Sequence, residues 1–381
     1  MLGLSRRSFA AIALSALLAA CQVVPKPGPQ TPGPQPTNPA DTLPTDTGRH
    51  RVALLVPLSG ENGPAGRAIA NATTMALLDT NAQNLRITTY DTAAGAGVAA
   101  SRALAEGNKV ILGPLMREEV TAVLAQARPA DVPLITFSND TSVAAADVFV
   151  MGHVPEQSVF RTVAWAATKG SKRYAALVPD GDYGRRTADA LSQAIGATGG
   201  QLVATERYDR GNTSIVSAAQ RLKAKGGYDT VLVSDGARLS ALAAGTLRGS
   251  GAALPKILGT ELWSGESSIA TSAALRGAWF SSVSDARYQQ FAKSYQTRFG
   301  EQPFRIATLG YDSVLLILRV AREWQPGRKF PAGKMLSPDG FLGLDGPFRF
   351  RANGVGERAM EVRQVGNGTV TVADPAPQRF N

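Results

Sequence analysis

From Arg51 onward, short apolar runs alternate with longer alanine-rich stretches whose apolar residues recur at spacings of three and four. Several short runs are almost continuously apolar, as is typical of parallel strands covered on both faces. The longer stretches have the periodicity of helices. This alternation predicts an α/β chain of doubly wound, Rossmann-like sheets. The expected strands are 52–57, 86–90, 110–112, 134–137, 174–178, 202–208, 230–234 and 256–259, and the expected helices include 65–80, 118–127, 156–169 and 185–198.

The alternation is interrupted at three places. The first break follows a predicted strand at 147–152, where His153 begins a link to a new series of βα units. The second break lies at 279–284 and the third near Phe341. Beyond the third, strands are expected at 348–351, 360–365 and 369–372, with Asn-Gly turns between them.

Three crossings of the chain predict two lobes joined by a three-stranded hinge. Ligands of such sheets bind beyond the carboxyl ends of the strands, which places the binding crevice between the lobes. We assign 51–152 with 281–340 to the N-terminal lobe, and 153–280 with 341–375 to the C-terminal lobe.

The amino-terminal residues have the pattern of an export signal. Arg6 and Arg7 precede an apolar run over 9–20. That run is about half as long as a membrane-spanning helix, so we interpret 1–20 as a cleaved signal peptide. The two arginines also resemble a twin-arginine export motif, which is a weaker signal because two arginines are also an ordinary positive n-region.

The sole cysteine of the chain, Cys21, follows Leu18-Ala19-Ala20, and this stretch resembles a bacterial lipobox. The resemblance implies cleavage before Cys21 and a lipid on its thiol. Gln22 stands where aspartate retains lipoproteins in the inner membrane. We therefore expect a lipid anchor in the outer membrane, with the protein facing the periplasm.

A proline-rich linker follows the cysteine over 21–48, with eight prolines between Pro25 and Pro44 and few apolar residues. Such a composition favours extended polyproline II, with a reach of up to about 80 Å. A disordered leader without a spacing role is the alternative. Both interpretations place the folded part away from the lipid.

Composition and motifs exclude several classes of function. The net charge of +10 is scattered, without a basic run interleaved with aromatics, so nucleic acid is not an expected partner. One cysteine allows no intramolecular disulfide, and no spacing of His, Asp and Glu suggests a metal site. The chain has neither a Gly-x-Ser-x-Gly elbow nor a glycine-rich phosphate loop. We expect no enzyme activity and no cofactor.

Six stretches carry a family resemblance. They are LLVPLSG at 54–60, ILGPL at 111–115, VPLITFSND at 132–140, GTELW at 259–263, DGF at 339–341 and DGPFRF at 345–350. Together they resemble type I periplasmic binding proteins of the leucine-binding architecture. More narrowly, they resemble the same domain of penicillin-binding protein activators, which are outer-membrane lipoproteins that stimulate peptidoglycan synthases. Those activators carry a helical repeat domain ahead of this fold, whereas this chain has the proline-rich linker there.

The resemblance implies a ligand cleft. In amino-acid receptors the loop matching 113–119 supplies small hydroxyl residues for the ligand's carboxylate, whereas here it supplies Met116, Arg117 and two glutamates. Tyr183 matches an aromatic that covers the ligand, and Glu261 matches an acidic residue that receives its ammonium group. The full set of expected cleft residues is Ser59, Met116, Arg117, Ser138, Asn139, Asp140, Tyr183, Asp235 and Glu261.

Three functions remain open on this basis. The leading hypothesis is a non-catalytic lipoprotein that binds and activates a penicillin-binding protein, with a small molecule or wall fragment as a possible cleft ligand. The alternative is a substrate-binding lipoprotein of an ABC importer for amino acids or related small molecules. A third is a purely structural wall-associated protein.

Overall fold

The computed structural model describes residues 48–211, 214–248 and 254–380. The predicted signal peptide 1–20, the lipidation site Cys21 and the linker as far as residue 47 lie outside the described residues. Thr47–Asn381 forms one compact unit, and the description that follows concerns this unit. Among the described residues, no helix has the length and apolar character needed to span a bilayer.

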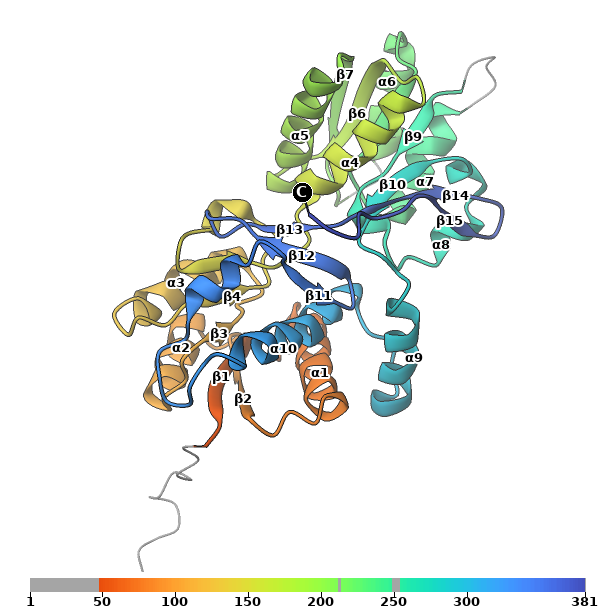
Figure 1. The fold of residues 1–381 in the computed structure, drawn as a ribbon. Coiled ribbons are helices and arrows are strands. Elements are labelled where there is room, and N and C mark those ends of the chain that lie inside the picture. The colour runs from red at the N-terminus through yellow and green to blue at the C-terminus, as the bar shows by residue number, and fades with distance from the viewer. Residues whose placement is uncertain (1–47, 212–213, 249–253, 381) are drawn as a thin grey trace, which may run out of the picture. The chain divides into compact units, whose positions relative to one another are not determined.

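The first lobe is built on a five-stranded parallel sheet of order β2-β1-β3-β4-β5 (Figure 1). Its strands are β1 (His50–Val56), β2 (Leu85–Asp91), β3 (Ile111–Leu112), β4 (Leu134–Thr136) and β5 (Val148–Val150). The helices of this lobe are α1 (Gly63–Asp79), α2 (Ala96–Ala105), α3 (Arg117–Ala127), α9 (Tyr288–Phe299) and α10 (Thr308–Ala321).

The position of strand β1 between two cores explains why its sequence is continuously apolar. Val52 and Leu54 pack into a core with α1 and α10, whereas Ala53 and Leu55 pack into a second core with α2 and α3. Because successive side chains of a strand point to opposite faces, a sheet covered on both sides needs an apolar residue at every position. The predicted strand at 52–57 is confirmed, with the observed strand beginning two residues earlier.

The second lobe contains a seven-stranded sheet of order β15-β14-β10-β9-β8-β6-β7. The strands are β6 (Arg173–Pro179), β7 (Gln201–Tyr208), β8 (Thr230–Val233), β9 (Lys256–Leu258), β10 (Trp279–Ser282), β14 (Glu361–Val365) and β15 (Val370–Asp374). The helices are α4 (Pro155–Thr168), α5 (Asp182–Thr198), α6 (Ser214–Lys225), α7 (Ala237–Leu247) and the short α8 (Ser268–Thr271). The side chains of strand β6 also point alternately into two cores. Leu177 packs with α6 and α7, and Val178 packs with α4 and α5.

A third, antiparallel sheet comprises β11 (Phe341–Gly343), β12 (Gly346–Phe350) and β13 (Gly356–Arg358). Phe348 and Phe350 pack into the core of the first lobe. The assignment of all of 341–375 to the second lobe therefore needs correction for 341–358. The phenylalanines alternate along β12, so one face of this strand is apolar and is buried among residues of α10 and β1. Only β14 and β15 extend the second sheet.

The chain passes between the lobes three times: between β5 and α4, between β10 and α9, and between β13 and β14 (Figure 1). The predicted α/β fold with two doubly wound lobes is confirmed. Short single-turn helices occupy several connections, namely η1 (Thr141–Val143), η2 (Glu261–Trp263), η3 (Ala273–Leu275), η4 (Arg305–Ala307) and η5 (Ala332–Leu336).

Candidate ligand cleft

A cavity of about 620 Å³ lies between the lobes, at the carboxyl ends of strands from both sheets. The first lobe contributes the loops after β3 and β4 and residues around η4. The second lobe contributes the first turn of α5 and the segment around η2. This is the position where doubly wound sheets bind ligands, because the loops at that edge present both backbone and side-chain polar groups.

Seven of the nine expected cleft residues line this cavity: Met116, Arg117, Ser138, Asn139, Asp140, Tyr183 and Glu261. Ser59 and Asp235 do not. Ser59 is exposed and lies near Asp91. Asp235 is buried behind η2, where its carboxylate accepts hydrogen bonds from the Tyr208 hydroxyl at 2.6 Å and from Arg210 Nε at 2.9 Å. That the seven lining residues contact a ligand stays a prediction.

Arg117, the first residue of α3, connects the two lobes at one side of the cavity. Its Nη1 donates to Asp140 of the same lobe at 2.7 Å and to Asp182 of the second lobe at 3.0 Å. Burial opposes the ionisation of Asp140, but hydrogen bonds from Ser142 and Arg117 outweigh it and lower its pKa. We call Arg117, Asp140 and Asp182 the latch. It occupies the loop that supplies hydroxyl groups in the amino-acid receptors that the sequence resembles.

Arg186, one turn beyond Tyr183 on α5, makes a second contact between the lobes. Its guanidinium pairs with both oxygens of Glu156, at 2.6 and 2.7 Å, and donates to the Asn139 carbonyl at 2.7 Å. Arg186 is not among the residues expected from the sequence. Arg186 lies three residues after Tyr183, so both side chains lie on one face of α5. This spacing is the sequence feature that could have identified Arg186 as a cleft residue.

Tyr183 and Glu261 form a buried pair on the second lobe. The Tyr183 hydroxyl donates to Glu261 Oε1 at 3.0 Å and lies 2.9 Å from Thr260 Oγ1. Glu261 is only 8% exposed, and its Oε2 has no hydrogen-bond partner within the described part of the chain. Desolvation by burial raises the pKa of Glu261 to about 7. A cationic group in the cavity would reverse that shift, because it stabilises the ionised carboxylate.

Charged residues from the first crossing, from η4 and from the turn between β11 and β12 meet beside the cavity. The carboxylate of Asp345, which is completely buried, lies 2.7 Å from His153 Nε2 and 2.7 Å from Arg305 Nη1. Arg305 also lines the cavity and donates from Nε to Ser264 Oγ of the second lobe at 3.2 Å. We call His153, Arg305 and Asp345 the hinge node.

The hinge node keeps Asp345 ionised. Burial opposes ionisation, but Arg305 and His153 outweigh it and hold the pKa of Asp345 below its ordinary value. Desolvation is also the main cause that lowers the pKa of His153. His153 lies at the first crossing, where the sequence places it. Arg305 is not among the expected residues, because it lies in a connection without helical or strand periodicity.

The remaining walls of the cavity are largely apolar, and they include Leu115, Phe137, Leu262, Phe304 and Leu309. The cavity therefore combines apolar surface with a few directed polar groups, as ligand-binding cavities do. Among residues 48–211, 214–248 and 254–380, no group of three or more His, Cys, Asp or Glu side chains is arranged to hold a metal ion.

The chain is similar in sequence to parts of several other proteins. It is 26% identical over 173 residues to an uncharacterized protein of Rickettsia prowazekii (strain Madrid E), covering 45% of this chain and 46% of that protein. It is 29% identical over 149 residues to the penicillin-binding protein activator LpoA of Photobacterium profundum, covering 37% of this chain and 24% of that protein. These matches span less than half the length of each relative.

The fold is shared with solved structures of much lower identity. The substrate-binding protein LivJ of a branched-chain amino acid transporter from Streptococcus pneumoniae, in complex with isoleucine, superposes with a TM-score of 0.66 at 20% identity. That match covers 86% of this chain and all of the other. A family model described as "Periplasmic binding protein" matches residues 50–369, which is most of the chain. The chain therefore belongs to the periplasmic binding protein family.

Proposed function

We propose that this chain is a non-catalytic lipoprotein, anchored in the outer membrane and facing the periplasm, that binds and activates a penicillin-binding protein. The observation that carries the proposal is the latch. Arg117 joins the lobes through Asp140 and Asp182 in the loop where the receptor resemblance implies a carboxylate-binding site. The chain's own side chains thus occupy that part of the cleft.

Two consequences of this geometry support a regulator. Arg186 donates a charge-assisted hydrogen bond to the Asn139 carbonyl across the cleft, and such bonds contribute about 1.5–3 kcal/mol. Together with the latch, this contact favours one lobe arrangement in the absence of ligand. A protein that acts by presenting a fixed surface to a partner benefits from that arrangement, whereas an importer's receptor depends on opening and closing around its cargo.

The relatives and the amino terminus agree with the proposal. One relative is named as a penicillin-binding protein activator. The proline-rich linker after Cys21 has the composition of a long tether, which suits a protein that must reach from the outer membrane to an enzyme of cell-wall synthesis.

A binding assay tests the proposal. The chain from residue 22 onward is immobilised, and each of the cell's own penicillin-binding proteins is passed over it as a purified full-length enzyme. We expect saturable binding of at least one of them. Absence of binding by every synthase would contradict the proposal.

One observation favours a second function, the binding of a small molecule with an ammonium group. Glu261 faces the cavity with an oxygen that has no partner in the described residues, and its burial disfavours the charge unless a cation pairs with it. This is the arrangement expected of a receptor for amino acids in an ABC importer.

Calorimetry distinguishes the two functions. Amino acids and peptide fragments of the cell wall are titrated into the chain, and each positive result is repeated with Glu261→Gln. The receptor function predicts binding that the substitution weakens at least tenfold. If none of these compounds binds, the receptor function is excluded and the proposed regulatory function is unaffected.

A further inference from the structure

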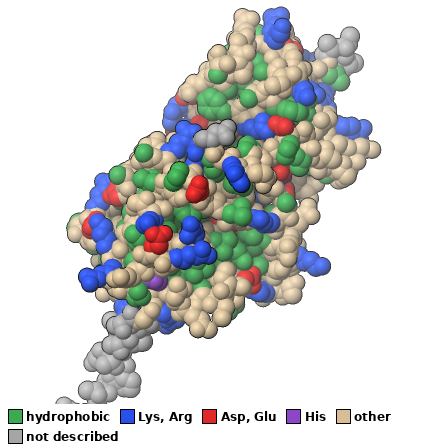
Figure 2. All heavy atoms as spheres, viewed as in Figure 1, with side chains coloured by type: hydrophobic (Ala, Val, Ile, Leu, Met, Phe, Trp, Pro, Cys, Tyr) green, Lys and Arg blue, Asp and Glu red, His purple; other side chains and the backbone are tan. Residues whose placement is uncertain are grey.

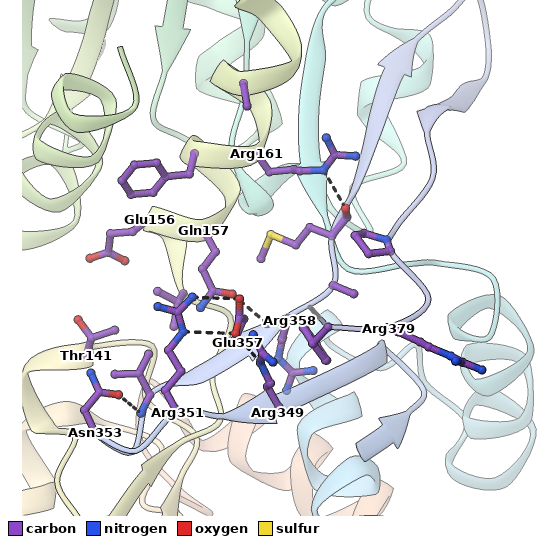
Figure 3. Close-up of a pocket in the computed structure, with 18 residues that line it drawn as sticks. Thr141, Glu156, Gln157, Arg161, Arg349, Arg351, Asn353, Glu357, Arg358 and Arg379 are labelled. Atoms are coloured by element: carbon purple, nitrogen blue, oxygen red, sulfur yellow. Dashed lines mark hydrogen bonds and ion pairs between the residues drawn. The ribbon is translucent and has the colours of Figure 1, made fainter. Parts of the chain in front are cut away.

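A second cavity, of about 900 Å³, lies at the junction between α4, the β12–β13 hairpin, the third crossing and the last described residues of the chain (Figure 3). It shares no lining residue with the ligand cleft. Helix α4 belongs to the second lobe, whereas β12 packs against the core of the first. We call this cavity the hinge groove.

Positive charge predominates in the lining of the hinge groove, which includes five arginines and two glutamates. The carboxylate of Glu357 is shared by two of the arginines, since Arg349 Nε lies 2.8 Å from it and Arg351 Nη2 lies 3.0 Å from it (Figure 3). Arg351 is the more exposed of the two, with 62% of its side-chain surface accessible. Its guanidinium can therefore pair with a second carboxylate from outside the chain.

Another arginine adds to that charge. Arg379 is exposed at the C-terminal end of the groove, and within residues 48–211, 214–248 and 254–380 no carboxylate pairs with it. Arg161, by contrast, is paired with Asp374. The accessible positive charge therefore belongs to Arg351 and Arg379. Figure 2 shows Lys and Arg side chains and hydrophobic atoms intermixed across this face of the molecule.

The rest of the groove is apolar and amide-rich. Phe160 of α4 has 38% of its surface exposed, whereas Val159 and Val163 on the same helix are buried. Val355, Met360 and Phe380 also line the groove. Exposed aromatics beside charged residues are typical of surfaces that bind other proteins. The side chains of Gln157 and Asn353 are amides, a group that can pair with peptide backbones.

We infer that the hinge groove binds an acidic peptide segment of a partner protein. Carboxylates of the segment pair with Arg351 and Arg379, and an apolar side chain of the segment packs against Phe160. A cavity of this size is at the upper end of those that hold small molecules, and its charged and apolar walls match a peptide that carries both kinds of side chain. The inference rests on the proposed function only for the identity of the partner.

A peptide of defined sequence tests the inference without any synthase. The probe is N-acetyl-Glu-Leu-Phe-Glu-amide, titrated calorimetrically into the chain from residue 22 onward. The control peptide replaces both glutamates by glutamine and so keeps the shape without the charge. We expect the acidic peptide to bind at least tenfold more tightly than the control peptide, with an affinity that falls as salt rises.

Two double variants locate the binding. Arg351→Gln with Arg379→Gln removes two groove charges while Arg349 still pairs with Glu357, so we expect the fold to be retained. Arg322→Gln with Arg328→Gln removes two exposed charges elsewhere and serves as the matched control. We expect the groove variant to weaken peptide binding at least tenfold and the control variant to leave it unchanged. Phe160→Ser should weaken it as well, through loss of the apolar contact.

Three outcomes would overturn the inference: no binding of the acidic peptide at millimolar concentration, equal binding of both peptides, or equal binding by both double variants. A vesicle assay checks the other anionic partner. If the chain sediments with anionic vesicles and the groove variant does not, the groove binds a membrane surface instead of a peptide. Peptide failure alongside synthase binding would overturn only this inference, whereas failure of synthase binding alone would overturn only the proposed function.

Discussion

The latch and the hinge node are both clusters of arginine and aspartate at the junction of the lobes, yet their surroundings differ. In the latch, Arg117 and Asp182 have 44% and 59% of their side-chain surface exposed, whereas Asp140 has 7%. In the hinge node, Arg305 is 10% exposed and Asp345 is completely buried. Water therefore screens the pair of Arg117 and Asp182 but does not reach the carboxylate of Asp345. Similar ion pairs should therefore serve different purposes, an adjustable contact in the latch and a fixed pivot in the hinge node.

The hinge node should give the largest effect on stability. Replacing Asp345 by asparagine leaves Arg305 and His153 without their carboxylate in a buried site, and breaking a buried pair costs about 3–5 kcal/mol. We expect the free energy of unfolding in urea to fall by an amount in that range. Asp182→Asn is the matched control from the exposed cluster, and an equal loss in both variants would contradict the comparison.

Glu261 should give the next largest effect, and one that depends on pH. Its pKa rises from the ordinary value of 4.5 to about 7 in the fold, chiefly through burial. The unfolded chain therefore ionises more readily, so the fold loses stability as pH rises from about 4.5 to about 7, by up to about 3 kcal/mol. Glu261→Gln should remove this loss, and it should stabilise the chain more at pH 8 than at pH 4.

Urea unfolding of Glu261→Gln and of the unmodified chain at both pH values checks the prediction. The same difference in unfolding free energy at pH 4 and pH 8 would mean that Glu261 is ionised in the fold at neutral pH. That result would also weaken the case for an ammonium ligand.

Arg186 should give an intermediate effect. Its guanidinium is about as buried as that of Arg305 but faces a partly exposed partner, Glu156. Arg186→Gln removes a charge-assisted bond to Asn139 and should lower the unfolding free energy by about 1.5–3 kcal/mol. The two lobes should also separate more easily, which small-angle scattering detects as a larger radius of gyration. An unchanged radius and unchanged stability would show that the contact does not hold the lobes together.

The latch should give the smallest effect on stability, and the effect should depend on salt. Arg117→Gln removes both ion pairs of an arginine that is 44% exposed, although the Asp140 side chain in one of them is only 7% exposed. We expect a change in the urea midpoint that is measurable only at low ionic strength, because salt screens exposed charges. A change that persists at high salt would mean that Arg117 is held in a less hydrated site than its exposure indicates.

The elements of this fold were predictable because covered parallel sheets have a distinctive pattern. Strand β1 sends Leu54 and Leu55 into two different cores, so its sequence is apolar throughout. The lobe of residues 341–358 was not predictable, because alternation identifies a strand and its apolar face but does not say which core that face covers. Phe348 and Phe350 pack on the first lobe, although strands β14 and β15 that follow them belong to the second.

The candidate site was predictable where a residue directly follows a strand. Ser138, Asn139 and Asp140 follow β4, and the structure places all three at the cavity. Arg186 and Arg305 were not predictable, because their partners Asn139 and Asp345 lie 47 and 40 residues away in the chain. Asp235 also follows a strand, but η2 covers it, and the position of that turn depends on packing of Trp263.

The most direct test of the proposed function is the rate of glycan polymerisation by the synthase that binds this chain, measured with and without an excess of the chain from residue 22 onward. The lipid is omitted, so any stimulation comes from the folded part and its linker. We predict that the chain raises the rate reproducibly and saturably. A rate that stays the same at saturating chain, for every synthase of the cell, would contradict the account.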